Sequence, residues 1–148
     1  MKIEFRLFNG PSDWGWVKSH VPLLRVQDTC GIMAIDTEKN ETVGAAIFDN
    51  FLHNSAQGTF IVTTPMVLKH GFLEEIADFI FEHCGKDYIY ALVQDGNKKA
   101  IKLNHHLGFR QIFRMPEGFG KGVDFLVLSL HKDDCRFFSG SKAAQQVA

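Results

Sequence analysis

The feature that most constrains the fold is a helix-type repeat between two strand-type segments in the middle of the chain. The apolar residues that recur at the spacing of one helix face are Leu73, Ile76, Ala77, Ile80 and Cys84. Acidic residues occupy the other side, so this segment is predicted to be an amphipathic helix that ends at Gly85. Residues 58–64 and 88–93 are β-branched, aromatic and apolar runs, which predicts strands. A strand–helix–strand step of this kind predicts a right-handed crossover between parallel strands.

The remaining periodicities complete the order β-α-β-β-β-α-β-α-β-β. The predicted strands are residues 3–7, 29–36, 42–48, 58–64, 88–93, 109–115 and 123–130, and the predicted helices are residues 13–17, 73–84 and 98–107. A loop rich in glycine is expected at residues 116–122. The fold class is therefore α/β (α+β), with one domain over residues 1–131. Residues 132–148 are expected to form a loosely ordered C-terminal tail.

Charge and cysteine content exclude several functional classes. Sixteen Lys and Arg residues against seventeen Asp and Glu residues give a net charge of −1, so a nucleic-acid partner is not expected. The three cysteines are far apart in sequence and have no metal-ligand spacing, so neither a disulfide framework nor a metal site is expected. The apolar runs are too short to span a bilayer, so no membrane partner is expected. The expected location is the cytoplasm.

Residues 97–109, NKKAIKLNHHLGF, resemble the N-x-x-A-x-x-L-Y-x-x-x-G-F segment of the GNAT superfamily of acetyl-CoA-dependent N-acyltransferases. The element order is also similar to that of this superfamily. The resemblance implies a mixed, mostly antiparallel sheet with a splayed pair of parallel strands and helices on both faces. A narrower likeness, carried by Gly122-Val123-Asp124, is to small phage GNAT-like proteins with a weakened cofactor loop.

The resemblance implies that acetyl-CoA is a cosubstrate whose pantetheine arm lies between residues 61–63 and 91–93. Its pyrophosphate would meet backbone N–H groups at the start of the central helix. The residues that the resemblance assigns to the cofactor are Ile61, Thr63, Lys69, His70, Gly71, Phe72, Leu73 and Asn97. Asn97 is equally expected to be a helix N-cap, and the two roles are compatible.

Two departures from the family pattern affect the site. Of the three anchor positions in the family's phosphate loop, this chain has Leu68, Gly71 and Leu73, so only the middle glycine remains. The position at which the family often has a tyrosine acid is Asn104, which cannot give up a proton near neutral pH.

The catalytic candidates are His53 and Asp49 as the base and Thr63, through its backbone N–H, as the donor that polarises the thioester carbonyl. His53 is also expected as an ordinary solvated loop histidine. The expected function is acetyl transfer to a small-molecule or protein amine by direct attack. The alternative is a catalytically degenerate binding or assembly module, for example phage-encoded. A homodimer is expected from the family resemblance, with the late strands or Phe137-Phe138 as contacts.

Overall fold

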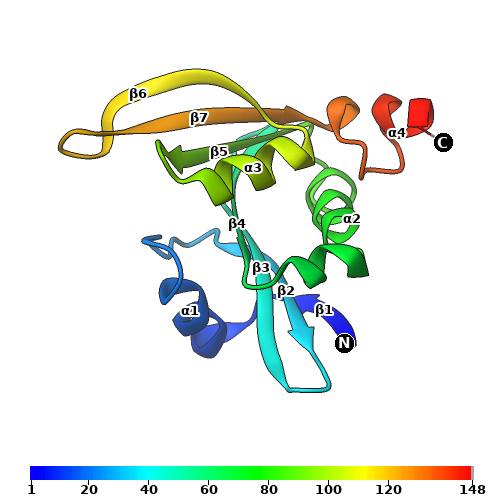
Figure 1. Ribbon diagram of the computed structural model, residues 1–148. Helices are drawn as coiled ribbons and strands as arrows, with labels where there is room; N and C mark the ends of the chain where they lie inside the picture. Colours follow the sequence, from blue (N-terminus) through cyan, green and yellow to red (C-terminus); the bar gives the residue numbers. More distant parts are fainter. Residues whose placement is uncertain (148) are drawn as a thin grey trace.

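One seven-stranded sheet organises the chain in the computed structural model, which describes residues 1–147 (Figure 1). The strands are β1 (Ile3–Leu7), β2 (Cys30–Asp36), β3 (Glu41–Asp49), β4 (Ser55–Val62), β5 (Tyr88–Gln94), β6 (Arg110–Gly120) and β7 (Val123–His131). Their order in the sheet is β1-β2-β3-β4-β5-β7-β6. Within residues 1–147, only β4 and β5 run parallel, and all other neighbours are antiparallel. The predicted mixed, mostly antiparallel sheet is confirmed.

The parallel pair separates after a short stretch of pairing. β4 and β5 are in register only at Ser55–Tyr88, Ala56–Ile89 and Gln57–Tyr90, although both strands continue beyond these residues. We call the point after Gln57 and Tyr90 the fork, and the space beyond it the gap. The predicted splay of the parallel pair is therefore present, and it begins before residues 61–63 and 91–93, where the sequence placed it.

Helices cover both faces of the sheet, as predicted. They are α1 (Gly10–Lys18), the 3₁₀ helix η1 (Pro65–His70), α2 (Phe72–Ala77), the π-helix η2 (Asp78–His83), α3 (Lys98–Leu107), the 3₁₀ helix η3 (Lys132–Asp134) and α4 (Lys142–Val147). α2, η2 and α3 pack with Ile32, Ala46 and Leu128 in the larger core cluster. α1 covers the other face through Val17, against Ile47. Side chains alternate along each strand, so neighbouring residues face opposite clusters.

The central helix changes its winding partway along. Residues 72–77 are α-helical, and residues 78–83 are π-helical, with the Cys84 N–H donating to the Phe79 carbonyl over 2.9 Å. Phe79, Ile80 and Phe81 are all buried in this π-helical part. The helix reaches Gly85 as predicted, where a φ of 69° ends it.

The prediction of a loop at residues 116–122 is wrong. β6 continues to Gly120 as one side of a long β6–β7 arm, with an irregular register between Met115 and Gly120 (Figure 1). The bend is held by Asp124, whose carboxylate accepts the Glu117 N–H over 2.8 Å. β4 also begins earlier than predicted, at Ser55.

The prediction of a loosely ordered tail after residue 131 is also wrong for the residues that the structure describes. Cys135 and Phe138 are buried in the main core, and the Phe138 ring lies 5.3 Å from that of Phe81. The buried Ser141 hydroxyl donates to the Cys135 carbonyl over 2.6 Å and accepts the Ala144 N–H. The segment after residue 131 is therefore part of the domain, and buried Phe138 is not available as a contact for a partner chain.

Over residues 1–147, the structure contains no helix that is both long and apolar enough to cross a membrane. In the same residues, no three His, Cys, Asp or Glu side chains are grouped closely enough to hold a metal ion.

Truncating Phe138 tests whether the C-terminal segment belongs to the core. Phe138→Ala should lower the free energy of unfolding by about 3 kcal/mol, because it removes a buried ring and leaves a cavity. Ser139→Ala, at an exposed neighbouring position, should leave it unchanged. Denaturant unfolding of both variants measures the difference, and equal stabilities would show that the segment does not pack as described.

Candidate functional site

Beyond the fork, the hydrogen bonds to β3 decide which backbone groups of β4 point into the gap; we call this alternation the phase of the strand. The Thr63 N–H and the Thr63 hydroxyl both donate to the Val43 carbonyl, over 3.0 Å and 2.9 Å. In an antiparallel ladder the backbone groups of alternate residues point to the same neighbour. Residues 57, 59, 61 and 63 therefore bond to β3, and the N–H groups of Phe60 and Val62 point into the gap.

The same reasoning fixes the phase of β5. The Tyr88 N–H donates to the Asn54 carbonyl over 3.2 Å, on the β4 side, and the Asp95 N–H donates to the Asp124 carbonyl over 3.0 Å, on the β7 side. The backbone groups of Leu92 therefore point into the gap. In the described chain the gap is bordered by backbone groups of Phe60, Val62 and Leu92 that no strand pairs.

This phase corrects the residues that the sequence assigned to the gap. Ile61 and Thr63 turn their N–H groups to β3, so they are one position out of step with the gap. The Thr63 N–H cannot polarise a substrate carbonyl, because the Val43 carbonyl already accepts it. Phe60 is the donor on β4 nearest to the fork that remains free for this role.

A row of polar side chains crosses the sheet at the fork. Asp49, Gln57, Tyr90 and Ser129 are consecutive partners on β3, β4, β5 and β7. Their chain neighbours Phe48, Ala56, Ile89 and Leu128 belong to the larger core cluster. By alternation, the four polar side chains share the opposite face, the one on which α1 lies. Sequence analysis found only Asp49 in this row. The period-two tyrosines within the apolar 88–93 run were the available signal for Tyr90.

Asp49 is the most perturbed group in this row. Its side chain is 3% exposed, and one carboxylate oxygen, Oδ1, has no hydrogen-bond partner. Burial raises the pKa of Asp49 to about 6, and the negative charge of Asp28 adds to the rise. A carboxylate with this pKa is ionised at neutral pH and accepts a proton more readily than an exposed aspartate.

Asp28 joins two loops beside Asp49. Its carboxylate accepts the N–H groups of Asn50 and Phe51, over 3.3 Å and 2.9 Å. The segment between α1 and β2 is thereby fastened to the segment between β3 and β4. Two acidic side chains therefore lie at the β3 end of the row.

His53 lies outside the row. It is exposed in the loop between β3 and β4, where its backbone carbonyl accepts a hydrogen bond from the Lys86 ammonium over 3.2 Å. It precedes Gln57 by four residues and lies in a turn that the Leu52 N–H closes on the Ser55 carbonyl over 2.8 Å. In the described chain, no hydrogen bond joins the His53 side chain to Asp49 or to the row at the fork.

The connection after β4 differs from an open phosphate-binding loop. Residues 65–70 form η1, whose 3₁₀ hydrogen bonds use the N–H groups of Lys69 and His70, while both side chains remain exposed. Gly71 has a φ of 86°, which separates η1 from α2 and explains the glycine by backbone conformation alone. Phe72 and Leu73 begin α2 with buried side chains, so the Leu73 side chain packs in the core.

Two asparagines of α3, one at its N-cap and one near its C-terminal end, have different environments. The Asn97 side chain accepts the Ala100 N–H over 3.2 Å, so the expected N-cap role is confirmed. Asn104 is buried, donates to the Ala100 carbonyl over 2.8 Å, and leaves its Oδ1 without a partner. The exposed lysines of α3 are Lys98, Lys99 and Lys102.

The cysteines are not activated as nucleophiles. Burial raises the pKa of Cys30 to about 11, and it also raises the pKa of Cys84 and Cys135. Thiols with raised pKa values are protonated at neutral pH and are poor nucleophiles.

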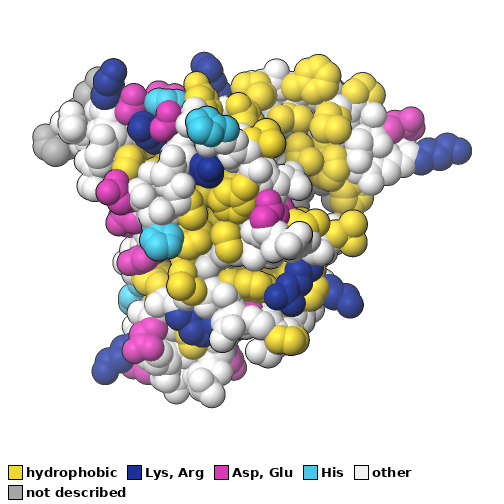
Figure 2. All heavy atoms as spheres, turned by 180° about the vertical axis from the view of Figure 1, so that it is seen from behind, with side chains coloured by type: hydrophobic (Ala, Val, Ile, Leu, Met, Phe, Trp, Pro, Cys, Tyr) yellow, Lys and Arg dark blue, Asp and Glu magenta, His cyan; other side chains and the backbone are white. Residues whose placement is uncertain are grey.

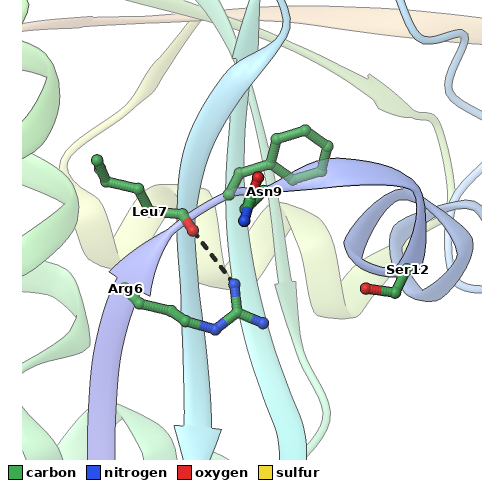
Figure 3. Close-up of a pocket in the computed structure, with 5 residues that line it drawn as sticks. Arg6, Leu7, Asn9 and Ser12 are labelled. Carbon is green, nitrogen blue, oxygen red and sulfur yellow. Dashed lines mark hydrogen bonds between the residues drawn. The ribbon is translucent and has the colours of Figure 1, made fainter.

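A hollow of about 480 Å³ lies at the junction of β1 and α1, at the sheet edge far from the fork (Figure 3). Arg6 lines it and donates to the Leu7 carbonyl over 3.2 Å. The guanidinium is also held by both carboxylate oxygens of Asp13, over 2.6 Å and 2.7 Å. The charge of Arg6 is therefore already paired with Asp13. None of the residues that line the hollow belongs to the row at the fork, so we do not assign the hollow to the candidate site.

Replacing Asp49 by asparagine should stabilise the protein at alkaline pH. Because the pKa is about 6 in the folded chain and near 4 in the unfolded chain, the folded state binds the extra proton between these values. Stability from this group is present below about pH 4 and is lost as the pH rises through 6. Asp49→Asn should raise the free energy of unfolding by about 1–3 kcal/mol at pH 8 and give no gain at pH 4. Melting curves across this range measure it, with exposed Asp78→Asn as the control. A gain that is independent of pH would contradict the assignment.

Comparisons with known proteins relate the fold to solved structures. No protein-family model and no curated protein sequence matches the chain. A mutant form of the spermidine N-acetyltransferase SpeG from Vibrio cholerae superposes with a TM-score of 0.68 and 17% identity, over 88% of this chain and 94% of that one. A second SpeG mutant form reaches 0.69 at 16% identity, over 99% and 100% of the two chains. A GNAT-family acetyltransferase from Bacillus anthracis gives 0.54 at 16% identity, over 69% and 66%. With its forked parallel pair in an otherwise antiparallel sheet, this chain has the GNAT fold.

Proposed function

We propose that this protein is an N-acyltransferase that moves an acetyl group from acetyl-CoA to an amine. The observation that carries the proposal is the fork, where backbone groups of Phe60, Val62 and Leu92 border a gap with no strand partner. Unpaired backbone groups inside a sheet are a liability unless a ligand or water meets them. The fold shared with N-acetyltransferases supports the proposal.

The gap suits an extended chain that carries its own amides. The pantetheine arm of acetyl-CoA is such a chain, and it can pair with Phe60, Val62 and Leu92 as a short strand would. When bound, acetyl-CoA supplies an acetyl group on a thioester. The Phe60 N–H, next to the fork, is the donor that we assign to the thioester carbonyl.

The phosphate end of acetyl-CoA would meet a mixed set of charges. Lys69 and His70 offer exposed side chains, and the first N–H groups of α2 belong to Phe72 and Leu73. Asn97 begins α3 across the gap, followed by exposed lysines. Glu74 and Glu75, exposed in the first turn of α2, oppose an anion. We therefore expect acetyl-CoA to bind, but with modest affinity.

Asp49 is the proposed base, in preference to His53. It shares the row at the fork, and its raised pKa suits the removal of one proton from an acceptor ammonium. The amine then forms a C–N bond as the C–S bond breaks, and the second proton that leaves the nitrogen passes through water to the released thiolate. Asn104 cannot supply that proton. The acceptor is a small-molecule or protein amine. A cytoplasmic setting and a homodimer through the exposed edge strand β6 complete the proposal.

A binding or assembly module without turnover is the second candidate. It is favoured by η1, which occupies the position of a phosphate loop, together with Glu74 and Glu75. The two candidates differ in two measurements on the purified chain, namely stabilisation by acetyl-CoA and release of free thiol when amines are added. Absence of both would support the module and contradict the transferase.

Proline substitution tests the phase of β4 in acetyl-CoA binding. Val62→Pro removes an N–H that faces the gap without breaking a bond to β3, so the melting temperature should remain close to that of the parent. Ile61→Pro removes an N–H that faces β3 and should destabilise the fold itself. Acetyl-CoA at 100 times its Kd should add about 2.7 kcal/mol to the parent. Val62→Pro should lose most of this gain, and full retention of it would contradict the proposed binding mode.

The pH dependence of turnover tests the base. Since Asp49 must be ionised to accept a proton, kcat/KM should rise with pH through about 6 and then level. Asp49→Asn should lower kcat/KM by about 100-fold and abolish this rise. The rate of thiol release at saturating acetyl-CoA, followed across this pH range, gives kcat/KM for the parent and for Asp49→Asn. If His53→Gln, rather than Asp49→Asn, removed the rise, the assignment would be wrong.

A further inference from the structure

The face around the row at the fork is apolar and aromatic. Next to the row, Leu92, Val127 and Phe113 are consecutive partners on β5, β7 and β6. The Tyr90 ring stacks on that of Tyr88, with ring centroids 6.1 Å apart. Phe113 is 60% exposed, and no helix of the described chain covers this half of the sheet. Seen from behind in Figure 2, hydrophobic side chains gather over the β6–β7 half of the molecule.

Two acidic side chains lie on this face at one end of the row. Asp49 and Asp28 lie at the β3 end of the row, and Asp49 keeps a buried oxygen without a partner. Arg110, the partner of Ser129, places a positive charge at the other end of the row. Asp95 and Asp124, at the far end of β5 and β7, share the opposite face with Val93 and Leu126 of the larger core cluster. Both are bound by Arg114, over 2.5 Å and 3.0 Å.

These observations describe a site for one cation attached to an apolar body. A buried carboxylate without a partner favours a single ammonium group, which both neutralises it and donates to its free oxygen. The aromatic and branched side chains of β5 and β7, two and three strands away across the same face, favour a flat or branched hydrocarbon. A second or third ammonium on the same molecule would meet Leu92, Val127 and Arg110 without a free carboxylate.

We propose that the acceptor is a monoamine carried on an aromatic or bulky apolar group, with its ammonium at Asp49 and its body against Tyr90, Leu92 and Val127. This inference rests on the proposed acetyl transfer and adds the class of acceptor. It separates this chain from the structural neighbours described as spermidine N-acetyltransferases, whose polyamine substrate carries several cations.

Competition between two acceptors is the test. With acetyl-CoA saturating at pH 8, phenethylamine should be acetylated with a kcat/KM at least 10-fold above that of spermidine. Calorimetric titration of each amine into the protein gives a second readout, in which phenethylamine should bind more tightly and Asp49→Asn should weaken it. An equal or greater kcat/KM for spermidine would overturn the inference while leaving acetyl transfer intact. Failure of acetyl-CoA to bind or react with either amine would remove both proposals.

A charge variant examines the apolar wall directly. Phe113→Glu adds a carboxylate on this face and should shift the preference toward spermidine by about 10-fold, since a distal cation then gains a partner. Gln111→Glu adds the same charge on the same strand, but on the opposite face, beside Leu128, and should shift nothing. Light scattering on both variants shows whether the oligomeric state is kept. An unchanged preference in Phe113→Glu with an unchanged oligomeric state would contradict the inference.

Discussion

The pairing of β4 with β5 ends after three residues, and the rest of the site depends on this interruption. Beyond the fork, each strand is paired on its other side, β4 with β3 and β5 with β7, so the two strands are held apart by the sheet that surrounds them. The outer ladders also decide which backbone groups face the gap. Because Thr63 is bonded to Val43, the groups of Phe60 and Val62 are left for a ligand. The gap is thus a consequence of sheet geometry and needs no special side chains.

Asp49 shows how the same sheet perturbs an acidic group. Its place at the end of β3 and the loop joined by Asp28 remove it from water, and its Oδ1 receives no donor in return. Ionisation of such a group lowers the stability of the folded chain. An aspartate at this position therefore makes sense where the group reacts or binds a cation. The neighbouring apolar wall limits where an acceptor can find opposite charge. Chemistry and specificity therefore both follow from which strand positions face the α1 side.

Sequence patterns predicted much of the fold, because periodicity reports burial. The helix stripe from Leu73 to Cys84 and the apolar run at 88–93 identified the crossover and, with the family-like segment at 97–109, the splayed pair. The phase of β4 could not be predicted in this way, since apolar residues occupy both faces at Phe60, Ile61 and Val62. Only the ladder with β3 decides it. The C-terminal segment was misjudged because Cys135 and Phe138 bury themselves without a regular period. The row partners Gln57 and Ser129 are ordinary polar residues until the register aligns them.

Amide hydrogen exchange along β4, resolved by residue, tests the central claim most directly. In the protein alone, the N–H groups of Phe60 and Val62 should exchange much faster than those of Ile61 and Thr63, which are bonded to β3. On addition of coenzyme A, protection should rise at Phe60 and Val62 and change little at their neighbours. Equal protection of all four groups in the protein alone, or no change at Phe60 and Val62 with saturating coenzyme A, would contradict the account.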